Sequence, residues 1–174
     1  EHPHKNIEII DSRSASVGQT LIAMKIIELA DAKKPFEEVV AKVNAYRNEL
    51  KTKFVLESLD TLRKNGRLSG LQAFIASALN IKPVMGATDD GHIKLVESVR
   101  GYRRAFMRFI EIIGEQGERM EDKVIGIAHV NCRERAEEFK SELLKRYKFK
   151  DIIIVEAAGL SSVYANQGGI IVAF

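Results

Sequence analysis

Residues 123–157 read KVIGIAHVNCRERAEEFKSELLKRYKFKDIIIVEA, and this stretch decides the fold class. It contains two short apolar runs, 123–129 and 151–157, that lack the alternation of a half-exposed strand. We therefore expect two strands that are covered on both faces. Residues 133–147 between them are expected to form a helix with Asn131 as its N-cap. A helix between two buried strands predicts an α/β fold.

The same alternation of strands and helices extends over the second half of the chain. Asp89-Asp90-Gly91 lies between two runs of strand-forming residues, which is a strong hairpin signal. The further expected elements are strands at 81–86, 92–99 and 168–174 and a helix at 102–113, followed later by a polar loop or short helix at 159–167. This order predicts a mixed sheet with covering helices, in which the helices near 102–113 and 133–147 pack against the sheet.

The first part of the chain predicts fewer elements. We expect strands at 7–10 and 53–56, helices at 17–30, 36–50 and 58–64, and a buried helix at 71–79. Two strands are too few to close a sheet of their own. Residues 1–70 are therefore expected to be the C-terminal part of a first α/β domain, and residues 71–174 a second α/β domain with the mixed sheet. The chain opens on Glu1 and reads as a fragment of a longer protein.

Composition excludes several classes of protein. The chain has 174 residues, of which 45% are hydrophobic and 29% charged, so it is neither disordered nor collagen-like. The single Cys132 allows no internal disulfide. No apolar run approaches the ~20 residues that span a bilayer, so we expect no stable membrane insertion. These features together predict a cytoplasmic protein.

The charge of the chain gives little reason to expect a nucleic-acid partner. There are 27 basic and 24 acidic residues, a net charge of +3. The densest basic cluster, residues 100–104, is short, and acidic residues run through most other segments. We expect no nucleic-acid binding. A basic binding module led by Arg100, Arg103 and Arg104 remains the least favoured alternative.

No motif predicts catalysis or a metal site. The four histidines are scattered along the sequence, and only His129 and Cys132 share a strand-to-helix junction. Two such groups are too few for a structural metal site, so His129 is expected to be hydrogen-bonded at the end of its strand. Glycine-rich phosphate loops and nucleophile elbows are absent from the sequence. We expect a non-catalytic protein without a metal or a cofactor.

Two features remain that could bind a ligand. The apolar run from Ala73 to Met85 is either plain core or one wall of an elongated apolar cavity. The cluster Ser161, Ser162, Tyr164 and Asn166 follows a buried strand and precedes two glycines. This is a place where open α/β sheets hold ligands, and its hydroxyls, amide and backbone N–H groups suit a carboxylate or a phosphate. An ordinary polar turn is the alternative.

Several stretches together resemble one known family. They are Ile9-Ile-Asp-Ser12 before a long helix, FVLESLDTLRKNGRLS at 54–69, Leu79-Asn-Ile-Lys-Pro83, Gly91-His-Ile93 with Val99-Arg-Gly101, and the closing glycine-rich strand. In this order they are similar to the DegV family, bacterial lipid-binding proteins that include the fatty-acid-carrying subunits of fatty acid kinase. The resemblance covers essentially the whole chain.

The resemblance implies a fold, a ligand and a partner. Members have two α/β domains that hold a long-chain fatty acid between them. They do not catalyse, but present the acyl group to a separate kinase. By this resemblance the chain corresponds to the C-terminal two-thirds of a member, and the missing N-terminal part of the same protein would complete the first domain. The fatty acid is a bound ligand, and no cofactor is implied.

The resemblance also assigns residues. Arg100 matches an arginine implicated in engaging the kinase. Arg67 matches the arginine of a Gly-Gly-Arg turn whose role is unassigned, and it is placed with Arg100 at the expected partner interface. The family's closing motif has a histidine that touches the lipid carboxylate, and Tyr164 stands in its place here, without a positive charge at pH 7. We expect the carboxylate end at Ser161, Ser162, Tyr164 and Asn166, and the acyl tail along Phe74, Leu79, Ile81 and Met85.

An enzymatic alternative is a phosphotransfer domain like those of dihydroxyacetone kinases, which have related α/β domains. Phosphoryl transfer requires groups that position and neutralise the transferred phosphate. The sequence offers no histidine or acidic cluster suited to that task, so the carrier is the leading hypothesis.

Overall fold

The computed structural model describes residues 4–68, 71 and 81–174. Its centre is a six-stranded sheet with the strand order β3-β2-β1-β6-β4-β5. The strands are β1 (Thr52–Val55), β2 (Ile81–Ala87), β3 (Ile93–Arg100), β4 (Val124–His129), β5 (Asp151–Glu156) and β6 (Ile170–Ala173). The helices are α1 (Val17–Asp31), α2 (Phe36–Glu49), α3 (Asp60–Lys64), α5 (Tyr102–Gln116), α6 (Arg133–Leu144) and α7 (Gly159–Ala165), with a 3-10 turn, η1 (Met120–Asp122).

The sheet is mixed, as the sequence predicts. β4 and β5 are parallel, with Val124 opposite Asp151 and His129 opposite Glu156, and α6 connects them. The other neighbouring strands are antiparallel. The expected α/β fold, with two apolar strands of 123–157 in one sheet and the hairpin of β2 and β3, is confirmed.

β1 occupies the middle of this sheet. It pairs with β2 on one side and with β6 on the other. The pairing with β6 continues past the strand, because Lys51 and Phe174 exchange two backbone hydrogen bonds of 2.7 and 3.0 Å. A strand from residues 1–70 therefore lies within the sheet that residues 81–173 form. The division into domains at residues 70 and 71 stays a prediction.

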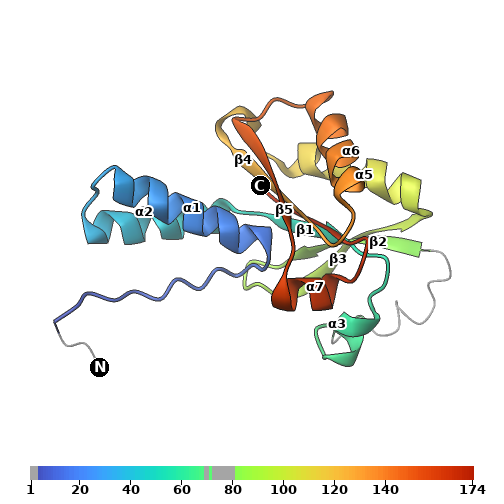
Figure 1. Cartoon of the computed structure of the whole chain (residues 1–174), viewed down its shortest axis with the longest axis horizontal. Coiled ribbons are helices and arrows are strands. Elements are labelled where there is room, and N and C mark those ends of the chain that lie inside the picture. Colours follow the sequence, from blue (N-terminus) through green and yellow to red (C-terminus); the bar gives the residue numbers. More distant parts are fainter. Residues whose placement is uncertain (1–3, 69–70, 72–80) are drawn as a thin grey trace.

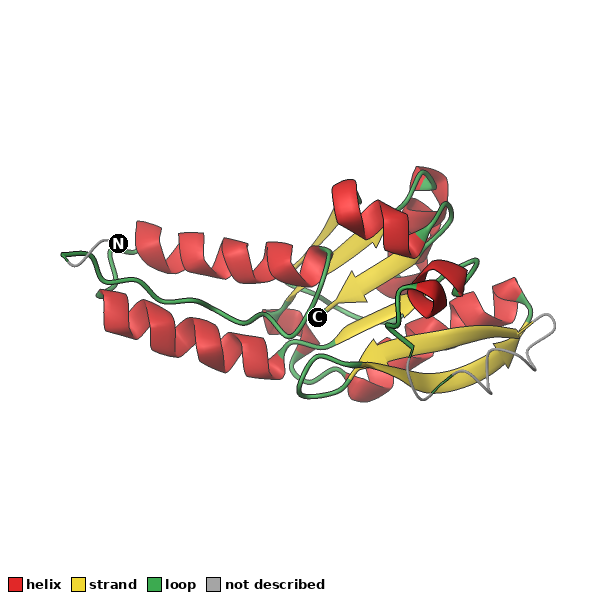
Figure 2. Cartoon of the chain, turned by 90° about the horizontal axis from the view of Figure 1, so that it is seen from below, coloured by secondary structure: helices red, strands yellow, loops and turns green. Residues whose placement is uncertain are grey.

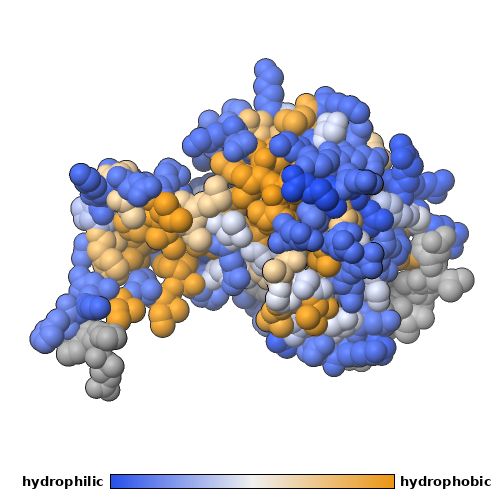
Figure 3. Space-filling view, in the orientation of Figure 1, coloured by the Kyte–Doolittle hydropathy of each residue, from blue (hydrophilic) through white to orange (hydrophobic). Residues whose placement is uncertain are grey.

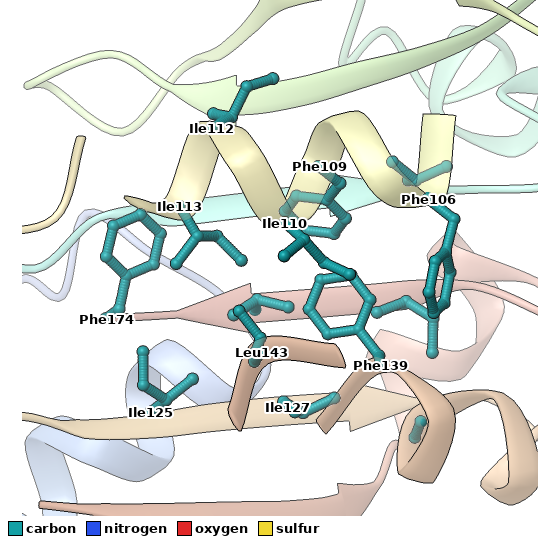
Figure 4. Packing of buried hydrophobic residues seen from close by; sticks show 14 of the residues in the cluster. Phe106, Phe109, Ile110, Ile112, Ile113, Ile125, Ile127, Phe139, Leu143 and Phe174 are labelled. Carbon is teal, nitrogen blue, oxygen red and sulfur yellow. The ribbon is translucent and has the colours of Figure 1, made fainter. Parts of the chain in front are cut away.

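One face of the sheet is covered by α5 and α6 (Figure 1). The apolar residues of α5 recur every three or four positions, which gives this helix one buried face. The Phe139 ring packs against Phe106, with centroids 5.1 Å apart, and against Phe109, with centroids 5.0 Å apart. These rings and the isoleucines around them form the main core (Figure 4).

The opposite face carries α1, α3 and α7, and α1 packs closely on it at Gly126 of β4. A Cβ at this position would lie 2.3 Å from Cγ2 of Val17. Glycine therefore lets the first turn of α1 contact the sheet directly. A side chain here would push α1 away.

Beyond the sheet, α1 and α2 continue as a projecting helical hairpin (Figures 1 and 2). This hairpin has a small core of its own, formed by Ile22, Leu29 and Val43. Ile27 is 58% exposed on this hairpin, and apolar side chains are visible on its surface (Figure 3).

Two of the expected elements differ in the structure. Residues 7–10 were expected to form a strand, and this is wrong: they form no strand, and Ile9 is 88% exposed. A strand needs a neighbour for its backbone groups, and no described strand lies beside this segment. The expected N-cap Asn131 is also wrong, because Cys132 occupies that position and Asn131 has a φ of 48°. The helix expected at 71–79 lies outside the described residues apart from Leu71.

β5 is an edge strand of the sheet. Side chains occupy both backbone groups of its second residue: the Ile152 N–H donates to Oδ1 of Asp151 at 2.7 Å, and Nζ of Lys140 donates to the Ile152 carbonyl at 3.4 Å. The backbone N–H and carbonyl groups at the start of this edge strand therefore have hydrogen-bond partners within the molecule.

Lys53 is a buried charge in the centre of the sheet. Its side chain is on the α5 side, lies across Gly86 of the neighbouring strand, and is only 5% exposed. A Cβ on Gly86 would come within 3.2 Å of Nζ, so this glycine makes room for the lysine. Burial, together with the charges of Lys94 and Lys51, lowers the pKa of Lys53 to about 8.

This lowered pKa makes stability depend on pH. The unfolded chain holds the proton up to the ordinary pKa of about 10.5, whereas the folded chain releases it near pH 8. Stability should therefore rise between pH 8 and 10.5, and below pH 8 the full cost of the buried charge, up to about 3 kcal/mol, is present. Lys53→Met is expected to increase the free energy of unfolding at pH 7 and to flatten this rise, as measured by urea unfolding at several pH values.

Lys148→Met, at an exposed position whose charge does not act on Lys53, is the matched control and should change neither quantity appreciably. An unaltered pH profile in the Lys53→Met protein would show that Lys53 carries no buried charge.

Candidate functional site

A pocket of about 420 Å³ opens between α3 and α7 on the face of the sheet opposite to α5. We call it the α3–α7 pocket. Alternate residues of β1 provide part of its floor, because Phe54 points to this face while Val55 joins the core under α5. Its apolar lining residues are Ala15, Phe54, Leu56, Leu62, Ala87, Ile93, Leu160, Ala165 and Ile171. Its size is within the range of small-molecule sites.

One group of polar side chains lies on the α3–α7 side of the pocket. Ser161 and Tyr164 of α7 line it, as does Arg67, which follows α3. The guanidinium carbon of Arg67 lies 5.9 Å from the ring centroid of Tyr164. A positive charge therefore stands beside the phenol, in reach of an anionic group at this part of the pocket.

A second polar group enters from the segment before α1. Ser14 lines the pocket, and its Oγ lies 2.6 Å from Oγ1 of Thr52, which is almost fully buried. A Cβ on Gly18 would lie 2.0 Å from the Ser14 Oγ, so this glycine admits the Ser14 side chain over the start of the helix. Each hydroxyl can donate one hydrogen bond, and only one of the two is needed between them.

The four residues expected at the carboxylate end divide into two pairs. Ser161 and Tyr164 line the pocket. The Ser162 hydroxyl instead donates to the Gly159 carbonyl at 2.8 Å, and Nδ2 of Asn166 donates to Thr61 of α3 at 3.3 Å. The first pair is available to a ligand. In the second pair, Ser162 bonds within α7 and Asn166 joins the end of α7 to α3.

The residues expected along the acyl tail are placed differently. Met85 is fully buried in the apolar cluster that adjoins the pocket. Ile81 is half-buried at the start of β2, and neither residue is among those lining the pocket. Phe74 and Leu79 lie outside the described residues.

Sequence reasoning missed the second polar group and part of the apolar wall. Ser14 and Ser16 were not among the residues expected to bind a ligand, yet both line the pocket. Ser16, at the N-cap of α1, makes no side-chain capping bond. The available signal was the spacing Ser14-Ala-Ser16-Val-Gly18, since two hydroxyls precede a glycine inside a helix. Ile93 could not be found in this way, because only the fold brings it to the site.

The two arginines expected at one partner interface are not brought together in one site. Arg67 lines the α3–α7 pocket, whereas Arg100 is exposed at the end of β3 and does not line it. Arg100 pairs with Ile81 at the opposite end of the β2–β3 hairpin from Gly91, which does line the pocket.

The junction of His129 and Cys132 holds no activated thiol. The Cys132 N–H donates to Nδ1 of the buried His129 at 3.4 Å, and burial raises the pKa of the Cys132 thiol. A thiol with a raised pKa is a poor nucleophile at neutral pH. Within residues 4–68, 71 and 81–174, no group of three or more His, Cys, Asp and Glu side chains is arranged to hold a metal ion. The helices in these ranges are also too short or too polar to cross a membrane.

Comparison with known proteins gives consistent matches along the whole chain. A DegV domain-containing protein of Streptococcus pyogenes is 34% identical over 174 residues, which are all of this chain and 61% of that protein. The chain thus spans about three-fifths of the length of the curated relatives it matches.

Two solved structures are similar in sequence and in fold. A DegV-family protein from Ruminococcus gnavus, described with vaccenic acid, is 48% identical, with a TM-score of 0.94 over 98% of this chain and 61% of that one. The fatty acid kinase B3 protein of Streptococcus pneumoniae, loaded with linoleic acid, is 32% identical, with a TM-score of 0.88 over 99% of this chain and 61% of that one.

The resemblance read from the sequence motifs is confirmed by a family model. The model described as "Uncharacterised protein, DegV family" matches residues 1–174, from the first residue to the last. The six-stranded mixed sheet and its covering helices agree with the solved structures. This chain therefore belongs to the DegV family.

Proposed function

We propose that this chain belongs to a non-catalytic carrier that binds a long-chain fatty acid in the α3–α7 pocket. The observation that carries the proposal is the form of the pocket, which has an apolar floor and walls and a polar group beside α7 that includes the cationic Arg67. A second arginine, Arg13, lines the pocket from the segment before α1. A fatty acid has the same two parts, and each CH₂ group it buries contributes about 0.8 kcal/mol to binding. The fatty acids described with two relatives support the proposal.

The carboxylate is proposed to lie near Tyr164, Ser161 and Arg67. The phenol donates one hydrogen bond, and the guanidinium beside it supplies the positive charge that a tyrosine lacks. In this arrangement Arg67 compensates for the absence of a histidine at position 164. The chain needs no metal or cofactor for such binding.

The proposal extends to the whole protein and its partners. We propose that residues 1–70 and 71–174 belong to two α/β domains of a longer cytoplasmic protein, whose further polypeptide covers the exposed apolar residues Ile9 and Ile27. The bound acyl group would be presented to a separate fatty acid kinase at a surface that includes Arg100. The kinase B3 protein among the relatives supports this partner.

Native mass spectrometry of the intact polypeptide purified from its host tests ligand binding directly. A mass increment equal to one long-chain fatty acid, identified after extraction by gas chromatography, is the expected result. Protein that carries no lipid and takes up none from added linoleic acid would refute the proposed function.

Tyr164→Phe tests the carboxylate end of the pocket. This change removes the hydroxyl donor and keeps the ring that packs under Arg67. A hydrogen bond to a charged group contributes about 1.5–3 kcal/mol, so the affinity for linoleic acid should fall about tenfold or more. Tyr147→Phe, in the segment that follows α6, is the matched control and should bind linoleic acid as the wild type does. An affinity within twofold of wild type in Tyr164→Phe would make Tyr164 structural only.

Ala87→Phe tests the apolar part of the pocket. Ala87 ends β2 and lines the pocket, so a phenyl group there would occupy space that the acyl tail needs. Binding of linoleic acid should fall at least tenfold while the unfolding midpoint changes little, as measured by calorimetric titration and urea unfolding. Ala45→Phe on the exposed side of α2 is the control. Normal affinity in the Ala87→Phe protein would place the tail elsewhere.

Arg100→Ala separates the partner surface from the ligand site. Because Arg100 is exposed and does not line the pocket, its loss should leave the fatty-acid affinity unchanged and reduce acyl phosphate formation by the kinase about tenfold or more. Lys148→Ala removes an exposed charge elsewhere and should change neither measurement. Equal kinase turnover of wild type and Arg100→Ala would remove Arg100 from the interface.

A further inference from the structure

Arg135 on α6 joins three parts of the chain that lie far apart in the sequence. Its Nη1 donates to the Gly168 carbonyl at 2.7 Å and to Oε1 of Glu57 at 2.8 Å. Its guanidinium carbon lies 4.1 Å from the ring centroid of Tyr102, at the start of α5. Glu57 is also paired with Lys82 at 2.6 Å, which fixes the carboxylate that Arg135 contacts.

The turn after α7 is shaped to receive this guanidinium. Gly168 has a φ of +85°, and a Cβ there would lie 2.8 Å from Nη1 of Arg135 and 2.8 Å from Cγ of Glu57. Only glycine fits this conformation and this space without strain. Two backbone hydrogen bonds also join this turn to Val130. The Gly168 N–H donates to the Val130 carbonyl at 2.9 Å, and the Val130 N–H donates to the Gly169 carbonyl at 3.2 Å.

The position of α7 depends on this turn and on the hydrogen bond from Asn166 to Thr61 of α3. The helix has seven residues, too few to be stable without tertiary contacts. Its outer residues Leu160 and Val163 are 72% and 57% exposed, and an apolar patch is visible near α7 in Figure 3. Few packing contacts therefore hold α7 from outside. The helix carries Ser161 and Tyr164, which line the α3–α7 pocket.

We infer that Arg135 is a positioning residue for the α3–α7 pocket: by holding the turn at Gly168 it sets the place of α7 and so the affinity for the ligand. The inference rests on the proposed function of that pocket. Arg135 itself does not line the pocket, so it acts through Tyr164 and Ser161. A surface ion pair with no such role would change overall stability only slightly and would leave α7 unaffected.

The test measures local order and affinity in the same variants of the intact protein. In Arg135→Ala without ligand, amide hydrogen exchange in residues 159–169 should accelerate about tenfold, while exchange in β4 and β5 stays as in wild type. The dissociation constant for linoleic acid should rise about threefold to tenfold. Arg135→Lys keeps the charge but loses the planar fork and the stacking on Tyr102, so intermediate values are expected.

Two further variants sharpen the comparison. Arg133→Ala is the matched control, because Arg133 lies on the same helix and pairs with Glu137 at 2.7 Å instead of with the turn. It should behave as wild type in both measurements. Gly168→Ala places a methyl group against Nη1 of Arg135 and should reproduce the pattern of Arg135→Ala.

Unchanged exchange in residues 159–169 of Arg135→Ala, or an equal acceleration in every segment, would overturn the inference. Local acceleration with an unchanged dissociation constant would overturn the link to affinity. If wild-type protein binds no linoleic acid, the proposed function fails, and the exchange data alone then decide whether Arg135 positions α7.

Discussion

The antiparallel pairing of β1 with β6 is the constraint on which the rest of the structure depends. It places a strand from the first third of the chain next to the last strand, in the middle of the sheet. Because side chains alternate along β1, Thr52 and Phe54 face the α3–α7 pocket, while Lys53 and Val55 face the side of α5. A shift of this pairing by one residue would exchange the two sets and remove both the pocket floor and part of the core.

The polar side chains of the pocket come from segments that lie far apart in the sequence and belong to different elements. The segment before α1 provides Ser14, the turn after α3 provides Arg67, and α7 provides Tyr164. Such a site depends on the residues that hold these segments together as much as on those that face the ligand. Arg135 and Gly168 fill that role for α7, and Gly18 fills it for Ser14.

The sequence predicted the elements whose burial is decided locally. β4, β5 and α5 were expected within a few residues of their bounds, because continuous apolar runs and a helical repeat of phenylalanine and isoleucine determine them. The strand predicted at residues 7–10 is wrong, because a strand also needs a neighbouring strand to pair with. The site was predictable only in part. Ser161 and Ser162 are the same residue type in adjacent positions, and only the fold decides that one lines the pocket and the other binds Gly159.

The edge strand β5 has a consequence for solubility during folding. Its run of three isoleucines and a valine, residues 152–155, has high β propensity and no charge, which is the composition of segments that assemble into cross-β fibrils. Asp151 and Glu156 flank this run, and Asp151 and Lys140 occupy the backbone groups of Ile152. Charged residues in these positions oppose the stacking of identical segments from different molecules. The side chains that bond to the start of this edge strand thus also oppose its pairing with copies of itself.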